Sequence, residues 1–466
     1  MYRKILYFFV AVYIIFFSVF SVLRYRNMYA NYFDLGIMHH VVYNTYKALQ
    51  TGDINRFLEH TDPNGYAQVA RSAVHNDVIL AVFAPFYFIY PSPEVLLVAQ
   101  TIALGLGAVA LFGIGRHVFG AHKKGDLYSL IFAVSYLLYS PLQFANRFDF
   151  HAVALSTSFL LFMYLYWLEK KYRWSLLFLG LSLFTKEQVG LTTAMFGGWI
   201  LLANLKLKRR KELRFGLLVS SISIAWVLFS FFVMIPFFRG DSHFATSRYE
   251  NIDVTSTIFR KSTWDYLWNL FAPVGFLSIL SPIVLIALPE FAVNLLSQEA
   301  NMRSIVFHYT SVITPFIFIS AIYGMKTVTL RLRSGQAVYG IPVAILIATL
   351  YFSVTASPLP YSQQRDLYVF SPQKNAKDAR EWEYRLRDDS IPVAATGNVG
   401  TFLSSRRKFY YFSQYYDRAN YVIIRPSEVF TYWDKATLIP IYQKLVTDPR
   451  FVLIDKRPNF EVYKKI

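Results

Sequence analysis

The chain has 466 residues, of which 55% are apolar, 18% are aromatic and only 16% are charged, whereas soluble domains carry about 25% charged residues. It contains no cysteine, which excludes disulfide bonds and cysteine-ligated metal sites. The formal net charge of +18 does not indicate nucleic-acid binding, because much of the basic excess lies in short links between apolar runs and no basic helix or single-strand platform is visible.

The first apolar run, residues 5–22, follows Arg3 and Lys4. It ends without the small-residue cleavage site of a signal peptide, so we interpret it as a retained first membrane span. Residues 24–90 are expected to form a long loop that is mostly too polar to cross a bilayer. Its last piece, residues 78–90, is apolar but short and bounded by proline, which favours a helix at the interface or a re-entrant piece.

Further apolar runs alternate with links that are mostly basic. These runs are residues 95–114, 127–142, 152–168, 174–200 (interrupted at 185–188), 215–238, 309–323 and 338–354. Residues 276–296 are apolar but hold two prolines and Glu290, and we leave open whether they form a hairpin, a re-entrant helix or two short spans. At roughly 20 residues per span, the chain is predicted to have about nine to eleven membrane segments.

Placing every basic cluster in the cytoplasm gives one self-consistent topology, because lysine and arginine hold short loops on that side. The N-terminus is then cytoplasmic. The long first loop and residues 147–151, 186–188 and 239–265 then lie outside, together with the C-terminal domain. We expect this multi-pass protein to reside in the plasma membrane.

The composition changes after Tyr361. A charged helical pattern and an amphipathic helical pattern occupy residues 374–387 and 435–446. Short β-rich pieces occupy residues 392–396, 409–412, 421–425, 451–455 and 460–463. This alternation predicts a transmembrane domain over residues 1–358 and a small extracytoplasmic α/β domain over residues 361–466.

Ionisable side chains gather on the outer face in this topology. Such groups at the edge of a span cost about 2.5–3.5 kcal/mol to insert, so they are candidates for function. Carboxylates, imidazoles and cations on one face can deprotonate a hydroxyl, bind a divalent metal or neutralise a phosphate. The set comprises Asp34, His39, His40, His75, Asp77, Asp149, His151, Lys186, Glu187, Glu299, Arg303 and His308.

Several short motifs carry a family resemblance through their order along the chain. They are Phe33-Asp34-Leu35-Gly36-Ile37, His75-Asn76-Asp77 before Ala84-Pro85, Phe148-Asp149-Phe150-His151, Phe184-Thr185-Lys186-Glu187, Leu288-Pro289-Glu290 and His308-Tyr309. In this order they resemble the DUF2079 family of predicted bacterial membrane proteins. That family is similar in layout to the C-type (GT-C) glycosyltransferases, multi-span enzymes that use polyprenyl-phosphate-linked sugars.

The resemblance implies roles for the outer residues. Asp34 stands where those enzymes keep an acidic residue in the first outer loop, and it is expected to act as base or to orient the acceptor. Asp149 and His151 stand at the acidic motif of the second outer loop, where they would assist catalysis or hold a divalent metal. A histidine replaces the second carboxylate common there, which leaves metal dependence open.

Six further residues are expected to bind substrate, with Lys186 or Arg303 facing the phosphate: His75, Asp77, Lys186, Glu187, Arg303 and His308. Structural alternatives stand beside these roles. Asp34 could cap a helix, and His75 and Asp77 could cap the piece that follows them. Asp149 and His151 could form an interfacial hydrogen-bonded pair. Lys186 could reach the lipid headgroups or pair with Glu187. His39, adjacent to His40, is expected to be structural or at the surface.

The leading hypothesis is a membrane glycosyltransferase that moves a sugar from a polyprenyl-phosphate donor to an extracytoplasmic glycan, lipid or protein acceptor. A lipid-linked donor needs no nucleotide cofactor, and the sequence has no GxxxxGK[ST] phosphate-binding loop. A transporter or lipid flippase is the alternative. It is less favoured because the candidate charges lie on one face and no halves repeat. A third hypothesis is a non-catalytic envelope-assembly protein that binds its partner through the C-terminal domain.

Overall fold

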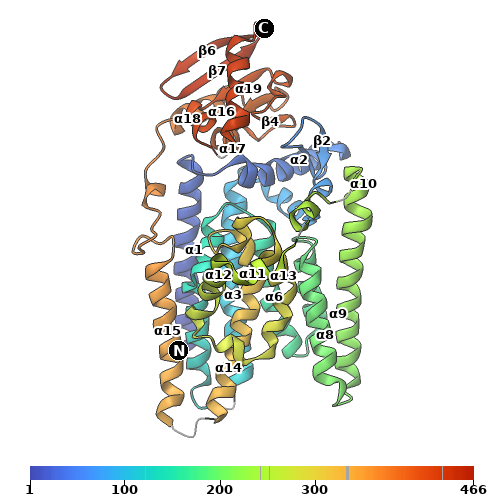
Figure 1. Ribbon diagram of the computed structural model, residues 1–466, viewed down its shortest axis with the longest axis vertical. Coiled ribbons are helices and arrows are strands. Elements are labelled where there is room, and N and C mark those ends of the chain that lie inside the picture. The colour runs from blue at the N-terminus through green and yellow to red at the C-terminus, as the bar shows by residue number, and fades with distance from the viewer. Residues whose placement is uncertain (121, 242, 251, 332–334, 433) are drawn as a thin grey trace.

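A computed structural model describes residues 1–120, 122–241, 243–250, 252–331, 335–432 and 434–466 of the chain. The molecule is elongated, with a long helical bundle below and a small α/β domain above (Figure 1). Between them, α2 (Ile37–Thr51) runs across the top of the bundle, beneath the α/β domain.

Four helices among the described residues are long and apolar enough to cross a membrane. They are α1 (Tyr2–Arg26), α3 (Glu94–Phe119), α14 (Ile313–Arg331) and the continuous helix Arg210–Arg239, which is built from α9 (Arg210–Phe229), η5 (Ser230–Met234) and α10 (Ile235–Arg239). A fifth span results if α4 (Gly125–Leu138) and α5 (Ser140–Arg147), which are bent by 44°, are counted as one.

Shorter apolar helices complete the bundle. They are η4 (Val78–Phe88), α6 (Ala152–Leu168), α8 (Val189–Leu205), the segment Pro282–Leu296 and the Gly340–Thr355 part of α15 (Gly335–Thr355), with α7 (Tyr172–Leu183) packed on α6. The predicted nine to eleven segments count these shorter helices as well. The fold class expected from the sequence, a helical multi-pass membrane protein with a small C-terminal α/β domain, is confirmed.

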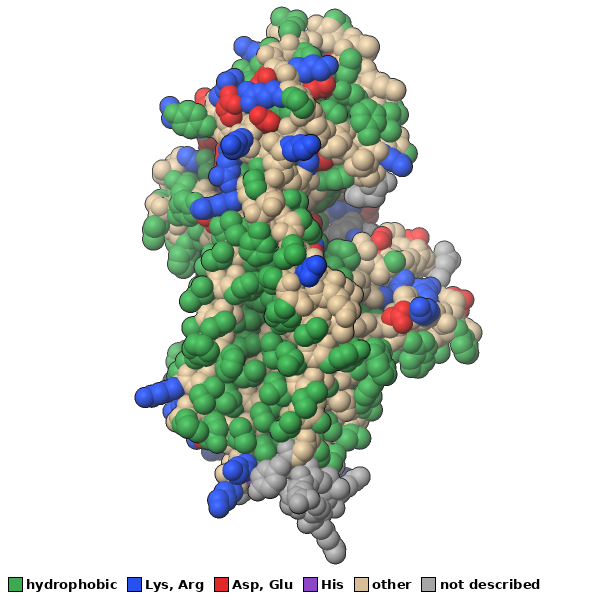
Figure 2. Space-filling view, turned by 90° about the vertical axis from the view of Figure 1, so that its left-hand side faces the viewer, with side chains coloured by type: hydrophobic (Ala, Val, Ile, Leu, Met, Phe, Trp, Pro, Cys, Tyr) green, Lys and Arg blue, Asp and Glu red, His purple; other side chains and the backbone are tan. Residues whose placement is uncertain are grey.

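The bundle presents a broad hydrophobic surface. Figure 2 shows apolar side chains covering the middle of one face, with Lys and Arg side chains above and below them. Among the exposed apolar residues are Phe8, Val12, Ile15 and Val19 on α1 and Val343, Ile347, Leu350 and Val354 on α15. A contiguous apolar surface of this size is unfavourable in water and indicates contact with lipid.

The basic links lie at the end of the bundle away from the α/β domain. The link between α3 and α4 lies beside Tyr2 and Arg3 at the start of α1. The turn between α8 and α9, residues 206–209, lies at the same end (Figure 1). Arg24 and the acid and imidazole groups of the first loop lie at the opposite end, so the two ends of the bundle differ in chemistry.

The segment left open by the sequence, residues 276–296, consists of three short helices. They are η8 (Leu277–Leu280), η9 (Pro282–Ala287) and α13 (Leu288–Leu296). Pro282 and Pro289 both stand in the first turn of their helices, where the missing N–H costs least. The segment packs against α14 and α8.

The first loop contains more structure than the sequence predicts. A π-helical turn, η1 (Tyr32–Gly36), leads into α2, and a hairpin of β1 (Glu59–Thr61) and β2 (Gln68–Ala70) follows. The apolar piece expected at the interface forms η4, which contains Pro85 and exposes Val82 and Phe86. The other short helices are η2 (Ile54–Arg56), η3 (Arg71–Ala73), η6 (Phe244–Tyr249), α11 (Val254–Phe259), α12 (Lys261–Phe271), η7 (Ala272–Val274), η10 (Ala300–Arg303), η11 (His308–Thr310), η12 (Leu367–Phe370) and η13 (Tyr416–Arg418).

The C-terminal domain is built on a five-stranded mixed sheet of order β4-β3-β5-β7-β6. β3 (Val393–Ala395) pairs in parallel with β4 (Phe409–Tyr411) and β5 (Tyr421–Ile424), whereas β7 (Phe460–Lys465) is antiparallel to β5 and to β6 (Phe451–Arg457). Its helices are α16 (Ala376–Arg385), α17 (Gly397–Leu403), α18 (Pro426–Thr431) and α19 (Lys435–Thr447). Each strand and helix predicted in this region is confirmed, and α17 and α18 were missed.

The α/β domain shares a hydrophobic core with the first loop. The rings of Tyr25 and Phe402 stack with centroids 5.0 Å apart, and those of Tyr32 and Phe409 lie 4.3 Å apart. α17 packs directly on η1, and Gly400 permits the close packing, because an added Cβ would lie 3.3 Å from the Cβ of Tyr32 in η1 and 2.6 Å from a ring carbon of Phe409 in β4. The two parts are therefore one packed unit at this end of the molecule.

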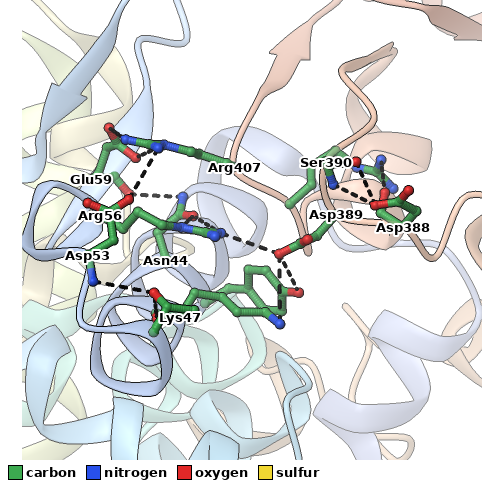
Figure 3. A network of polar contacts seen from close by, with 12 residues as sticks. Asn44, Lys47, Asp53, Arg56, Glu59, Asp388, Asp389, Ser390 and Arg407 are labelled. Carbon is green, nitrogen blue, oxygen red and sulfur yellow. Dashed lines mark hydrogen bonds and ion pairs between the residues drawn. The ribbon is translucent and has the colours of Figure 1, made fainter.

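Ion pairs reinforce the same contact. Figure 3 shows Arg407 of the α/β domain reaching Glu59, 3.0 Å away, and Asp53, 3.3 Å away, on the first loop. Asp389 in turn forms ion pairs with Arg56, 3.4 Å away, and with Lys47, 3.8 Å away. Partly exposed pairs of this kind contribute up to about 1 kcal/mol each, so the shared core carries more of the association than they do.

Candidate active site

A cavity of about 270 Å³ opens where η1, the end of the first loop, the start of α6, the α7–α8 link and η11 meet. Its lining includes six of the residues that the sequence singled out: Asp34, His75, Asp77, His151, Lys186 and His308. These side chains come from five segments of the chain, between residues 34 and 308. The structure thus brings together most of the predicted site.

Asp34 and His151 form a pair at the cavity wall. Asn31 caps η1 by accepting a hydrogen bond from the Phe33 N–H at 3.0 Å, which fixes the turn that presents Asp34. Nε2 of His151 lies 3.3 Å from Oδ1 of Asp34. Nδ1 of His151 lies 3.0 Å from the carbonyl oxygen of Asp149, which can only accept, so this nitrogen carries a proton. Nε2 is therefore the atom that can exchange a proton with Asp34.

His308 stacks on His151 with ring centroids 3.8 Å apart and planes 17° apart. The Phe148 ring lies near both imidazoles, with its centroid 5.2 Å from that of His151 and 6.1 Å from that of His308. Burial, followed by the neighbouring His151, Lys186 and His75, lowers the pKa of His308 well below its ordinary value. His308 is therefore neutral at physiological pH and holds the His151 ring in place.

Asp149 lies behind this wall rather than in it. Its carboxylate forms an ion pair with Arg24 at the end of α1 and accepts the backbone N–H of Asn31 at 2.9 Å. Asp149 is buried, with 2% of its side chain exposed. Because Asn31 caps the turn that carries Asp34, Asp149 acts on the site by positioning that turn.

Lys186 supplies a positive charge to the cavity. Within the part of the chain that the structure describes, its ammonium group makes no hydrogen bond and no ion pair. Burial lowers the pKa of Lys186, while Glu187, Glu290 and Asp77 oppose the shift. A partly buried cation without a partner is a binding site for an anion.

Two arginines that the sequence did not single out also line the cavity, Arg71 and Arg248. Arg71 is buried and donates two hydrogen bonds of 2.9 Å to the Asp77 carboxylate, so Asp77 holds this arginine in position. The ion pair could have been predicted from the sequence of the first loop, because Arg71 is the nearest arginine or lysine before Asp77. Arg248 lies in the polar stretch 239–265, whose sequence shows no periodicity that would place it.

Glu187 lies just outside the cavity and contacts two histidines through one carboxylate oxygen. His75 Nδ1 and His243 Nε2 lie 2.8 Å and 3.1 Å from its Oε1, and the Asn76 N–H donates to Oε2 at 2.9 Å. Burial alone would raise the pKa of Glu187, but His75, His243 and Lys186 together lower it well below its ordinary value. His75, Glu187 and His243 are the described residues whose donor atoms could hold a metal, since these atoms lie within 4.8 Å of one another.

Four predicted candidates lie elsewhere, among them Glu299, which is exposed at the start of η10. Arg303 is buried and donates to the carbonyl of Ser297, so the structure does not bring it into the cavity. His39 bonds to Tyr87 and to Ser405 at 2.8 Å each, and His40 lies 3.1 Å from the carbonyl oxygen of Arg407. Burial lowers the pKa of His39 to about 3 and that of His40 to about 4, so both are neutral structural residues of the contact with the α/β domain.

Comparisons with known proteins agree with this architecture. The family model described as "Predicted membrane protein (DUF2079)" matches residues 24–439. ArnT from Cupriavidus metallidurans has the same fold. Its crystal structure bound to undecaprenyl phosphate superposes with a TM-score of 0.61 at 12% identity, covering 98% of this chain and 97% of that one. The apo structure of the same protein superposes with a TM-score of 0.56 at 12% identity, covering 100% of this chain and 98% of that one. No curated protein matches the sequence.

The similarity to ArnT concerns the fold, because 12% identity is too low to carry substrate or residue roles across. It extends over nearly the full length of both chains, α/β domain included. The GT-C-like layout expected from the sequence motifs is therefore confirmed.

Proposed function

The chain belongs to the DUF2079 family of predicted membrane proteins, and from its fold and its cavity we propose that it is an integral-membrane glycosyltransferase. It moves a sugar from a polyprenyl-phosphate donor to a hydroxyl of an extracytoplasmic glycan, lipid or protein acceptor. The observation that carries the proposal is the ammonium group of Lys186, which has no partner among the described residues, in a cavity that also holds the Asp34–His151 pair. One GT-C-like neighbour, ArnT, was crystallised with undecaprenyl phosphate, which supports a lipid phosphate as the ligand.

The geometry suggests how the groups divide the reaction. The bond between the anomeric carbon and the donor phosphate oxygen breaks, and the acceptor oxygen forms a new bond to that carbon. Asp34, with His151 beside it, takes the proton of the acceptor hydroxyl. Lys186 neutralises the phosphate that departs with the bonding electron pair, a charge-assisted contact.

The proposed setting is the plasma membrane with the cavity and the α/β domain on the outer side. The basic links at the opposite end of the bundle support this orientation, because such links stay cytoplasmic. The apolar surface of α1 and α15 provides the contact with lipid, through which a lipid-linked donor approaches.

Replacement of Asp34 tests the proposed reaction. The purified chain in lipid nanodiscs is incubated with a panel of undecaprenyl-phosphate-linked pentoses and hexoses and with an envelope extract that supplies acceptor hydroxyls, and released undecaprenyl phosphate is measured. Asp34→Asn is expected to lower the rate at least about 100-fold, the usual contribution of a general base, without changing expression or Tm.

The matched control is Asp126→Asn, an exposed carboxylate at the other end of the bundle, which is expected to keep full activity. Full activity of the Asp34→Asn protein would refute the assignment. Solute uptake into vesicles that survives this replacement would favour the transporter instead.

A further inference from the structure

His75, Glu187 and His243 form a cluster that the proposed transfer reaction does not use. His75 belongs to the first loop, Glu187 to the α7–α8 link and His243 to the stretch after α10, so the fold brings together three distant segments. Glu187 and His243 are buried, and His75 is partly buried and also lines the cavity. Each residue offers a donor atom, and these atoms lie within 4.8 Å of one another.

Two of the three distances between donor atoms are close to those of a tetrahedral metal site. His75 Nδ1 and His243 Nε2 lie 2.8 Å and 3.1 Å from Glu187 Oε1, and the two nitrogens lie within 4.8 Å of each other. With metal–ligand bonds of about 2.0–2.1 Å, neighbouring ligand atoms of a tetrahedron are about 3.3 Å apart. Shifts of a few tenths of an ångström would bring both distances to Glu187 to this value.

The surroundings hold these side chains in place. The second oxygen of Glu187 accepts the Asn76 N–H at 2.9 Å, and the Asn76 side chain donates to Ser230 Oγ at 2.8 Å. The ring of Phe231 stacks on His243 with centroids 5.1 Å apart. Such outer contacts orient metal ligands and typically change metal affinity 10–100-fold when they are removed.

We propose that His75, Glu187 and His243 bind one divalent transition-metal ion, with Zn²⁺ as the expected species. Two imidazoles and one carboxylate suit zinc, whereas magnesium and calcium prefer oxygen ligands alone. Three protein ligands leave a fourth position for water or a substrate oxygen. Because His75 lines the cavity, the ion adds positive charge to the wall that already carries Lys186.

This assignment differs from the metal ligands expected from the sequence, Asp149 and His151. The Asp149 carboxylate is engaged by Arg24 and by the Asn31 N–H, and His151 Nδ1 donates to a backbone carbonyl. His243 escaped sequence reasoning because it lies alone in a polar stretch without a ligand-spacing motif.

Zinc content of the purified full chain tests the proposal. The chain is stripped with a chelator, incubated with ZnCl₂, freed of excess metal and analysed by mass spectrometry of the elements. The wild type is expected to retain about one zinc per chain and to gain Tm. Glu187→Gln and His243→Ala are expected to weaken zinc binding at least tenfold.

Two controls separate this site from adventitious binding. His117→Gln and His122→Gln remove exposed histidines at the opposite end of the bundle and are expected to leave the retained zinc unchanged. The X-ray absorption spectrum of the wild-type zinc edge, which needs no variant, is expected to show imidazole scattering from two histidines.

A wild type that retains no zinc, or cluster variants that retain as much zinc as the wild type, would overturn the proposal and leave a hydrogen-bonded cluster only. These readouts contain no sugar donor. Failure of metal binding is therefore distinguishable from failure of the glycosyltransferase assignment.

Discussion

At the scale of residues, the two carboxylates of the outer motifs have different surroundings, one beside an imidazole in the cavity and one in a buried ion pair behind it. His151 Nε2 lies 3.3 Å from Asp34 Oδ1. Asp149 forms an ion pair with Arg24 and accepts the backbone N–H of Asn31. Removing one partner of a buried ion pair costs about 3–5 kcal/mol, so Asp149 is a positioning residue whose loss would disturb the turn that presents Asp34.

Lys186 is expected to bind the lipid phosphate through a charge-assisted hydrogen bond. Such a bond contributes about 1.5–3 kcal/mol, so Lys186→Met is expected to weaken binding of undecaprenyl phosphate about 10–100-fold. Binding to the detergent-purified chain is measured by native mass spectrometry. Lys208→Met, an exposed lysine at the other end of the bundle, serves as the control. Equal affinity of wild type and Lys186→Met would remove Lys186 from the site.

Glu428 makes the stability of the α/β domain depend on pH. It is buried and accepts the Asn398 N–H of α17 at 3.1 Å, and burial, opposed by Arg425, raises the pKa of its carboxyl to about 7. The folded chain then keeps a proton that the unfolded chain releases near pH 4.5, so stability falls as pH rises from about 4.5 to 7 and levels off above.

The expected loss is at most about 3.5 kcal/mol, since one pKa unit corresponds to about 1.4 kcal/mol. Glu428→Gln is expected to flatten the dependence of Tm on pH between pH 5 and 8. The share of the pH dependence that comes from Glu383 is expected to remain, because burial also raises the pKa of this carboxyl to about 7. Parallel curves for the two proteins would contradict the role of Glu428.

At the scale of elements, α17 joins the α/β domain to the turn that carries Asp34. Gly400→Ala would place a Cβ 2.6 Å from a ring carbon of Phe409 and 3.3 Å from the Cβ of Tyr32. Overpacking of this kind costs about 1–3 kcal/mol, so the variant is expected to have a lower Tm and faster proteolysis after Tyr361.

The matched control for this change is Gly198→Ala in α8, where an added Cβ meets no atom within 4 Å. It is expected to be neutral or to stabilise the helix by up to about 1 kcal/mol. If both variants behave alike, the close packing of α17 on η1 is not what holds the domain.

The elements that hydropathy and alternation predict are those whose burial repeats regularly along the chain. α6 begins and ends at the predicted residues 152 and 168, and the five strands of the sheet agree within a few residues. α17 was missed because its two glycines and its Asn and Thr have weak helix propensity, and its packing on η1 stabilises it. The packing of α17 on η1 stabilises this helix, and its local sequence alone does not predict it.

Residues at the ends or breaks of apolar runs, as His151 and Lys186 are, could be singled out from the sequence, and Asp34 could be singled out from its motif after the first span. Arg71, His243 and Arg248 were missed because only the fold of the loops brings them to the cavity or beside it. Asp149 and Arg303 were assigned to the site from position alone, whereas their partners, Arg24 and the Ser297 carbonyl, are set by packing.

At the scale of the whole molecule, the α/β domain and the bundle meet through the turn that carries Asp34. The side chain of Asn398 in α17 donates to the carbonyls of Met28 and Ala30 at 3.0 Å, and Tyr432 accepts from Asn31 at 3.3 Å. The domain therefore fixes the position of Asp34 from above while Asp149 and Arg24 fix it from below. The proposed reaction needs this end of the molecule to face the outside, where an extracytoplasmic acceptor is found.

Sidedness can be measured directly because the chain contains no cysteine. Single cysteines replace Lys123, which is exposed in the basic link between α3 and α4, and Arg387, which is exposed on the α/β domain. Intact cells are treated with a membrane-impermeant maleimide. If the α/β domain lies outside, R387C is expected to react at once and K123C only after the membrane is permeabilised. Labelling of both positions from the same side, or in the reverse order, would contradict this topology.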